Sequence, residues 1–363
     1  MSVVGLGTAN LGTVGLDYAA PLRAVDEVSI DRDAGHLGTS ARCVVRVDKT
    51  VSGHDPYMAG HFPGLTMLPA VFLLEGLRQA ADVALRPAGE DQVELLWVRS
   101  ARLLAPMLGG ERIRTEAEIE PVAAGQPGQP GRPRWSVRAV CTRADGTRVA
   151  TLAVVVGQPD EEAPRPAADG PGSDARFTDG LLDPGGPPVA DHARIRALLP
   201  VRHPTILVDR VDAVEPGRQI RTAKVVTASE PCYRGLPEGL PPRAFAYPRT
   251  LALESFGQSA ALLWLYTTAA ARAGQGPSGV GPRHRRAPGE ATTGGAGFDD
   301  LLMLAVIRDC RFTGTVHPGE TLRHVVRLER LAGPNAFLAG EIWADRRRVA
   351  TVDSLLAVSR AAR

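Results

Sequence analysis

GHFPG, residues 60–64, is the stretch of sequence that decides the fold, together with the long apolar segment that begins at Pro69. It places His61 in a tight glycine and proline turn just before that segment, and Glu75 lies fourteen residues after His61, inside the segment. Proline at the first helical position, followed by a long apolar run, predicts a helix of about seventeen residues or more that is buried on most sides. A histidine and a carboxylate at the start of such a helix form a candidate acid/base pair.

The second half of the chain repeats this layout. Four blocks recur in the same order: PLRAVD (21–26), DPYMAG (55–60), PAVFLLE (69–75) and RVAT (148–151) correspond to PTILVD (204–209), EPCYRG (230–235), PRTLALE (248–254) and RVAT (348–351). We therefore expect the two halves to be diverged copies of one domain. The histidine is missing from the second copy, where Leu236 stands in its place.

Composition divides the chain into two domains and a linker. Residues 158–192 are rich in proline and glycine and poor in large apolar groups, which predicts an interdomain linker between domains at 1–157 and 193–363. Residues 273–297 have a similar composition and predict a long mobile loop. Short β-rich segments are expected at 43–47, 113–119, 136–143, 147–156, 220–226, 322–328, 338–344 and 349–359. Each copy is thus predicted to be α+β, with one long helix wrapped by an antiparallel sheet.

Charge and cysteine usage exclude several classes of function. The net charge is +2 and the basic residues are spread along the chain, so nothing predicts a nucleic-acid surface. The four cysteines lie far apart, without metal-ligand spacing, and no leader pattern opens the chain, which favours a reduced, cytoplasmic enzyme without a metal. The most apolar stretch, residues 251–266, contains Glu254 and Gln258, which favours a buried helix over a membrane span.

The pattern GHFPG, four residues, proline, then E-x-x-x-Q (Glu75 to Gln79) resembles the bacterial 3-hydroxyacyl-acyl-carrier-protein dehydratases of the hotdog fold. In the second copy, LPVRHPTILVDR (199–210) resembles the N-terminal signature of that family, and residues 308–312 and 318–320 resemble its later strand and turn. The resemblance implies a double hotdog, similar to the fused dehydratase domains of modular polyketide synthases.

In that family, a hotdog dimer forms two sites, each with the histidine of one protomer and the carboxylate of the other. The resemblance therefore implies that His61 of the first copy meets Glu254 of the second copy, as base and acid of one live site. Glu75 is implied to face Leu236 at a second, inactive site. A neutral imidazole suits removal of a weakly acidic α-proton near pH 7, and a carboxyl group kept protonated by an apolar site suits protonation of a leaving hydroxyl.

Three further residues are candidates for binding the oxyanion and the substrate. The amide of Ala70, near the start of the helix after Pro69, is expected to donate to the thioester oxygen. The family usually has glycine at this position, so the alanine methyl group would lie beside the thioester. Gly64 is expected to serve through the turn that it forms, and Gln258 is expected to orient Glu254 by an i, i+4 contact.

The sequence leaves several alternatives open. The leading hypothesis is dehydration of 3-hydroxyacyl chains carried on an acyl carrier protein, without a cofactor, in fatty-acid or polyketide assembly. A ketosynthase or ketoreductase of the same pathway is a further candidate partner, and the chain is expected to be a monomeric pseudo-dimer or a homodimer. The alternatives are a hotdog thioesterase, a dehydratase that also isomerises the double bond, and a catalytically silent subunit that binds an acyl carrier or ketosynthase.

Overall fold

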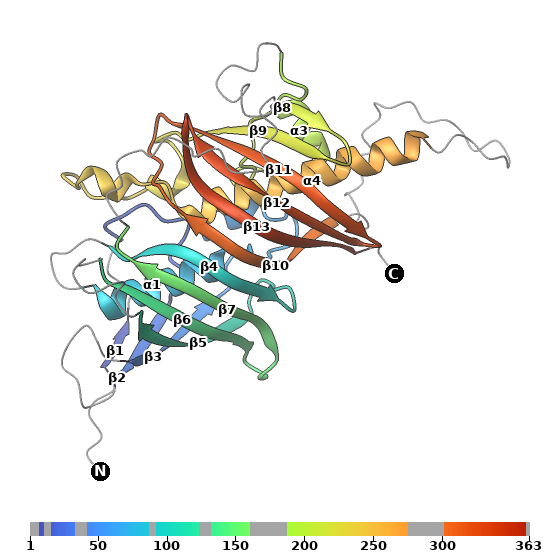
Figure 1. Ribbon diagram of the computed structural model, residues 1–363. Helices are drawn as coiled ribbons and strands as arrows, with labels where there is room; N and C mark the ends of the chain where they lie inside the picture. Colours follow the sequence, from blue (N-terminus) through green and yellow to red (C-terminus); the bar gives the residue numbers. More distant parts are fainter. Residues whose placement is uncertain are drawn as a thin grey trace.

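The computed structural model describes residues 7–10, 16–32, 42–86, 92–122, 132–159, 187–274 and 301–360. Figure 1 shows two similar halves, each built from an antiparallel sheet and one long helix. The predicted linker lies outside the described residues between 160 and 186, so the domain boundaries stay a prediction. The predicted loop at 273–297 lies outside them except for its first two residues, which end a helix.

The N-terminal half packs the helix α1 (Phe72–Leu85) against its sheet. Its strands are β1 (Gly7–Asn10), β2 (Glu27–Arg32), β3 (Cys43–Thr50), β4 (Glu94–Leu103), β5 (Arg112–Pro121), β6 (Arg134–Arg143) and β7 (Arg148–Gly157), and a short 3₁₀ turn, η2, covers Met58–Gly60. Buried and exposed residues alternate along β5 and β6, because one face of these strands covers the core and the other meets solvent.

The C-terminal half repeats this arrangement around the longer helix α4 (Arg249–Gly274), which packs mainly against β9 and β11. Its elements are α3 (His192–Leu198), β8 (Arg210–Glu215), β9 (Gln219–Val225), the 3₁₀ turns η3 (Pro231–Tyr233) and η4 (Pro242–Phe245), β10 (Leu301–Phe312), β11 (Thr321–Ala332), β12 (Asn335–Ala344) and β13 (Arg347–Arg360).

All thirteen described strands form one sheet, in the order β1-β2-β3-β5-β6-β7-β4-β10-β13-β12-β11-β9-β8. Apart from β1 at one outer edge, the order of the described strands on one side of the β4–β10 junction mirrors the order on the other, as a pseudo-twofold axis requires. At the junction β4 pairs antiparallel with β10, and Ala101 lies opposite Ile307. The two halves are therefore joined by backbone hydrogen bonds into one continuous sheet.

The two lysines of the chain confirm the repeat in atomic detail. Lys49 forms an ion pair with Asp55 at 3.0 Å, and Lys224 forms one with Glu230 at 2.8 Å. Each ion pair joins a strand, β3 or β9, to the segment that follows it in the same half. Equivalent sequence blocks thus adopt equivalent contacts, which is what diverged copies of one domain predict.

Two expectations about the elements need correction. The helix after Pro69 is fourteen residues long and begins only at Phe72, so Pro69 is not its first residue. The amides of Phe72, Leu73 and Leu74 each bond the carbonyl three residues earlier, which makes residues 69–71 a tightened 3₁₀ turn. In the second copy the helix does begin directly after Pro248.

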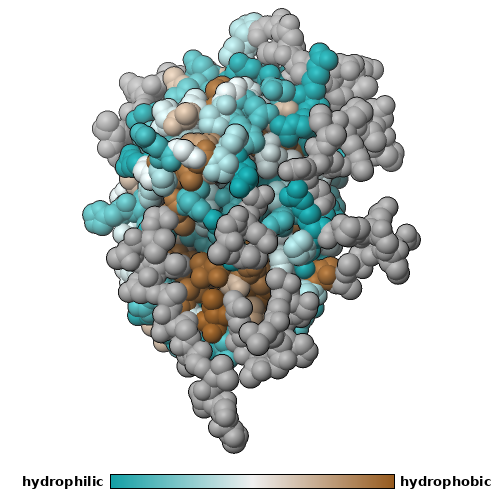
Figure 2. All heavy atoms as spheres, turned by 90° about the vertical axis from the view of Figure 1, so that its left-hand side faces the viewer, coloured by the Kyte–Doolittle hydropathy of each residue, from teal (hydrophilic) through white to brown (hydrophobic). Residues whose placement is uncertain are grey.

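Both polar and apolar residues lie on the surface of the molecule. Figure 2 shows one face of the molecule, on which hydrophilic residues dominate the upper part and hydrophobic residues gather in the lower part. The four cysteines all lie among the described residues, are buried, and form no disulfide.

Candidate active site

A cavity of about 330 Å³ lies between the two halves. It is lined by residues of the 61–71 segment, the 103–107 loop after β4, the 199–201 segment, α4, β10 and β13. Most of the lining is apolar, and Glu254 supplies the one acidic side chain among the described residues that line it. His61 contributes the imidazole, so the structure brings these two residues, one from each half, to the same cavity.

The orientation of His61 determines which ring nitrogen can act as a base. Its Nδ1 lies 3.0 Å from the carbonyl oxygen of Met67. A carbonyl oxygen can only accept a hydrogen bond, so Nδ1 carries the hydrogen and the lone pair of the neutral ring is on Nε2. The Phe62 ring stacks on the imidazole with centroids 4.4 Å apart, and restricts its rotation. His61 is thus held in the tautomer that a base requires.

The turn that carries His61 is fastened to the opposite half. The carbonyl oxygen of Gly60 accepts from the amide of Arg202 at 3.0 Å, and the hydroxyl of the buried Thr205 donates to the carbonyl oxygen of Tyr57. A Cβ atom on Gly60 would lie 2.1 Å from the Arg202 carbonyl oxygen, so only glycine permits this approach. These contacts hold the imidazole at a fixed position relative to the C-terminal half.

Gln258 connects these contacts to Glu254 through hydrogen bonds. The side-chain amide of Gln258 donates to the Thr205 carbonyl oxygen at 2.7 Å and to Glu254 Oε1 at 3.1 Å. Its own oxygen accepts from the amide of Leu207 at 2.8 Å. The structure therefore contains the expected i, i+4 contact between Glu254 and Gln258. Thr205 contacts both Gln258 and the Tyr57 carbonyl oxygen, so it connects the segment that carries His61 to the side chain that holds Glu254.

Ala70 and Gly64 occupy different positions relative to the cavity. Ala70 lines the cavity from the tightened turn before α1, together with Val71. Gly64 has φ +82° in the turn beyond His61, a conformation that favours glycine. The contribution of Gly64 is thus to the turn, while Ala70 lies where an oxyanion donor is expected.

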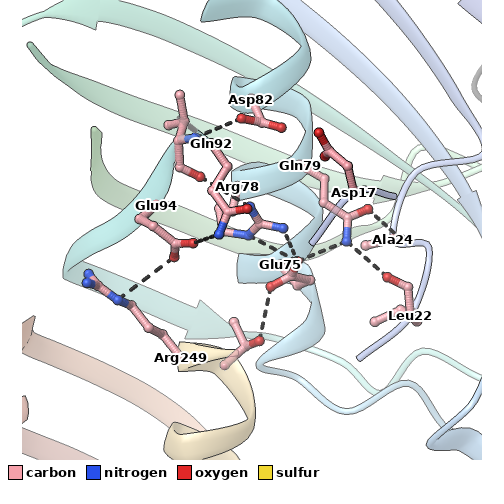
Figure 3. Close-up of polar contacts among 12 residues, drawn as sticks. Asp17, Leu22, Ala24, Glu75, Arg78, Gln79, Asp82, Gln92, Glu94 and Arg249 are labelled. Atoms are coloured by element: carbon pink, nitrogen blue, oxygen red, sulfur yellow. Dashed lines mark hydrogen bonds and ion pairs between the residues drawn. The ribbon is translucent and has the colours of Figure 1, made fainter. Parts of the chain in front are cut away.

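Glu75 lies outside this cavity, in a closed network of polar contacts (Figure 3). Its Oε1 accepts from Arg78 at 2.7 and 3.1 Å and from Gln79 at 2.9 Å, and its Oε2 accepts from Thr250 at 3.1 Å. Glu75 is 1% exposed and Arg78 is 4% exposed. Leu236 packs against the hydrophobic core. The second carboxylate is thus engaged by protein groups from both halves.

Two buried guanidinium groups balance the charge of this network. Burial alone would lower the pKa of Arg78, but the adjacent carboxylates of Glu75 and Glu94 hold it well above its ordinary value. Burial lowers the pKa of Arg249, against the opposing effect of Glu94, whose carboxylate lies 3.8 Å from the Arg249 Nε. Arg249 also donates to the carbonyl oxygen of Leu95 at 2.7 Å, so the network ties the start of α4 to β4.

Sequence reasoning missed Thr205, Arg78 and the role of Gly60 in close packing. The alignment of the two copies contains the signal for Arg78, because it places this arginine on a largely buried helix at a position where the second copy has a glycine. Nothing in the sequence signals that Thr205 contacts Tyr57, since this contact depends on how the halves pack.

The part of the chain that the structure describes offers neither a metal site nor a membrane span. It contains no group of three or more His, Cys, Asp or Glu side chains that could hold a metal ion. Among the described helices, none is sufficiently long and apolar to cross a membrane.

Comparisons with solved structures show the fold. The dehydratase domain from the CurJ module of curacin polyketide synthase superposes with a TM-score of 0.54 and 11% identity, over 94% of this chain and 96% of that domain. A trans-AT PKS dehydratase domain from Brevibacillus brevis superposes with a TM-score of 0.54 and 11% identity, over 95% of this chain and 100% of that one. The predicted double hotdog is confirmed over nearly the whole chain.

Comparisons with curated proteins show the family, although no family model matches the chain. The 3-hydroxyacyl-(acyl-carrier-protein) dehydratase FabZ of Chloroflexus aggregans is 34% identical over 137 residues, which are 38% of this chain and 74% of that protein. FabZ of Actinobacillus pleuropneumoniae serotype 5b is 29% identical over 173 residues, which are 47% of this chain and 92% of that protein. The chain therefore belongs to the 3-hydroxyacyl-acyl-carrier-protein dehydratase family of hydro-lyases.

Proposed function

We propose that this protein removes water from 3-hydroxyacyl thioesters carried on an acyl carrier protein and forms trans-2-enoyl thioesters, at one live site made by His61 and Glu254. The observation that carries the proposal is that these two groups, from different halves, line one apolar cavity in a member of a dehydratase family. Elimination of water is redox-neutral, so two proton-transferring groups suffice for it. Fatty-acid or polyketide assembly is the setting.

In the proposed reaction, Nε2 of His61 takes the proton from C2 of the acyl chain. The electron pair of that C–H bond forms the C2=C3 double bond, and the C3–O bond breaks. Glu254 delivers its proton to the departing hydroxyl, which leaves as water. Gln258 orients the carboxyl group through the hydrogen bond described above.

Negative charge grows on the thioester oxygen as the α-proton leaves. A backbone amide aimed at that oxygen stabilises the charge without needing to reorganise during the reaction. We assign this role to the amide of Ala70, because Ala70 lines the cavity beside the first turn of α1, where the positive end of the helix dipole adds to the effect.

Single substitutions test the proposal. His61→Ala and Glu254→Gln are each expected to lower kcat by at least ~10²-fold, since each removes one of the two proton-transferring groups. The measurement is the rate of formation of enoyl thioester on an acyl carrier protein, followed by mass spectrometry. Dehydration that persists at the wild-type rate in either variant would overturn the mechanism.

The matched control uses the carboxylate outside the cavity. Glu75→Gln makes the same chemical change as Glu254→Gln, and is expected to keep kcat within a few-fold of wild type at a temperature where the variant is folded. The same spectra test the thioesterase alternative, because hydrolysis releases free acid whereas dehydration leaves the acyl group on its carrier. Free acid without enoyl product would favour the thioesterase.

A further inference from the structure

The two helices place different residues at one equivalent position. In α1, Arg78 stands three residues after Glu75 and one before Gln79, and in α4, Gly257 has the same relation to Glu254 and Gln258. The two glutamines confirm that the positions correspond. The side-chain nitrogen of Gln79 donates to the Leu22 carbonyl oxygen and its oxygen accepts from the Ala24 amide, both at 2.9 Å.

Gln258 makes the same two bonds to Thr205 and Leu207, which are the residues that correspond to Leu22 and Ala24 in the repeat. The helices are therefore in the same register relative to their own halves. Arg78 and Gly257 can be compared directly as occupants of one position.

These two occupants have opposite effects on the space beside the carboxylate. The Arg78 guanidinium donates two hydrogen bonds to Glu75 and fills the volume next to it. A Cβ atom built on Gly257 would meet no atom within 4 Å, and Gly257 lines the cavity. The volume that an arginine fills at one carboxylate is thus open at the other.

Neither packing nor backbone conformation accounts for this glycine. Gly257 lies inside α4 and is not among the glycines with positive φ, so an alanine would adopt the same conformation. Glycine in a helix interior costs about 0.5–1 kcal/mol relative to alanine. This destabilising glycine stands where a larger side chain would extend into the cavity. We take this as an indication that the open volume beside Glu254 serves to hold part of the substrate.

Gly257 also lies between the proposed acid and the apolar part of the cavity. Glu254, Gly257, Gln258 and Ala261 follow the i, i+3, i+4, i+7 spacing of one helix face, and all four line the cavity. Apolar residues of β10 and β13 complete the lining: Leu302, Met303, Leu304, Leu355, Ala357 and Val358. An acyl chain whose C3 hydroxyl contacts Glu254 and whose tail lies near Ala261 has to pass over Gly257.

We propose that Gly257 is a specificity-determining residue, which keeps a passage open for the carbon chain beyond C3 and so admits 3-hydroxyacyl thioesters with long apolar tails. The inference rests on the proposed function, because it takes Glu254 as the group that contacts the C3 hydroxyl. A larger residue at this position closes the passage, as Arg78 does at the other carboxylate, and leaves room only for short chains.

The test compares two substrates in one enzyme. The kcat/KM values for 3-hydroxydecanoyl and 3-hydroxybutyryl thioesters of an acyl carrier protein are measured for wild type, Gly257→Ala and Gly257→Leu. In Gly257→Leu the decanoyl-to-butyryl ratio of kcat/KM is expected to fall by at least ~10-fold, because the leucine occupies space that only the longer chain needs. In Gly257→Ala the ratio is expected to fall by a smaller factor.

The alanine variant also serves as the folding control. It is expected to have a raised Tm, because it removes the cost of the helix glycine without a steric clash. If Gly257→Leu fails to fold, an alanine variant with a raised Tm and an unchanged ratio overturns the inference. Equal losses for both substrates in a folded leucine variant also overturn it. Failure of the wild type to dehydrate either substrate refutes the proposed function instead.

Discussion

His324 on β11 is buried on the side of the sheet that faces α4, where its ring centroid lies 6.4 Å from that of Phe256. Its Nδ1 lies 3.4 Å from the hydroxyl of Thr222. Burial, with a smaller effect of the same sign from Lys224, lowers the pKa of His324 to about 3, against a weaker opposing effect from the Ala252 backbone. The imidazole is therefore neutral in the folded protein at any pH near neutrality.

This neutral imidazole predicts a loss of stability in weak acid. Below its ordinary pKa of about 6.5, the unfolded chain binds a proton at His324 that the folded chain does not bind. The free energy of unfolding should thus fall as pH decreases from 6.5 towards 3, with His324 contributing roughly 2 kcal/mol between pH 7 and pH 5. Urea unfolding of wild type and His324→Leu at both values checks this. Equal losses in the two proteins would contradict it.

Residue-level reasoning from the sequence identified residues that share one cavity where a motif was present, and it missed the contacts that depend on how the halves pack. The GHFPG motif and the repeat led to His61 and Glu254, and both line the cavity. Their functional roles stay a prediction that the substitutions above test. The contact between Thr205 and Tyr57 joins residues that lie far apart in the chain, and no local pattern encodes it.

At the scale of the elements, α1 and α4 meet through the ionic network around Glu75. Thr250 and Arg249, at the start of α4, bond to Glu75 and to the Leu95 carbonyl oxygen of β4. The first turn of α4 is thus fixed to the N-terminal half, and Glu254 follows one turn later on the same helix.

Removal of one charge from this network should cost more stability than removal of two. Glu75→Gln leaves the buried Arg78 without its closest carboxylate, and should lower the free energy of unfolding by about 3–5 kcal/mol. The double variant Glu75→Gln/Arg78→Met removes both charges and should lose less than Glu75→Gln alone. Denaturant unfolding of both variants and of Arg78→Met measures the coupling. Additive losses would show that the two charges do not interact.

The strands were predicted best where one face is buried and the other exposed. The segments expected at 113–119 and 136–143 lie within β5 and β6, whose burial alternates regularly. β4 was missed, because two register shifts interrupt its pairing with β7 and break the alternation of buried and exposed residues. In β10 a further shift occurs between Leu304 and Val306. Such bulges adjust the sheet at the junction, where the halves meet.

At the scale of the whole molecule, the β4–β10 junction predicts that the halves stay together without a covalent connection. We expect a protein with a protease site inserted between residues 160 and 186 to elute as one particle after cleavage, because backbone pairing and the shared hydrophobic core hold the fragments. Size-exclusion chromatography of the cleaved protein checks this, with the uncleaved protein as control. Elution of two separate fragments would contradict it.

Joining two copies in one chain also removes a constraint that identical subunits impose. In a homodimer the two sites are made by identical chains, so a substitution that closes one site closes the other as well. In the fused chain, Arg78 and Gly257 are encoded separately, so either one can change without the other. Under the proposed function, the second copy supplies the open position beside the acid and the first copy supplies an internal ionic network, so the two halves of one polypeptide contribute different things.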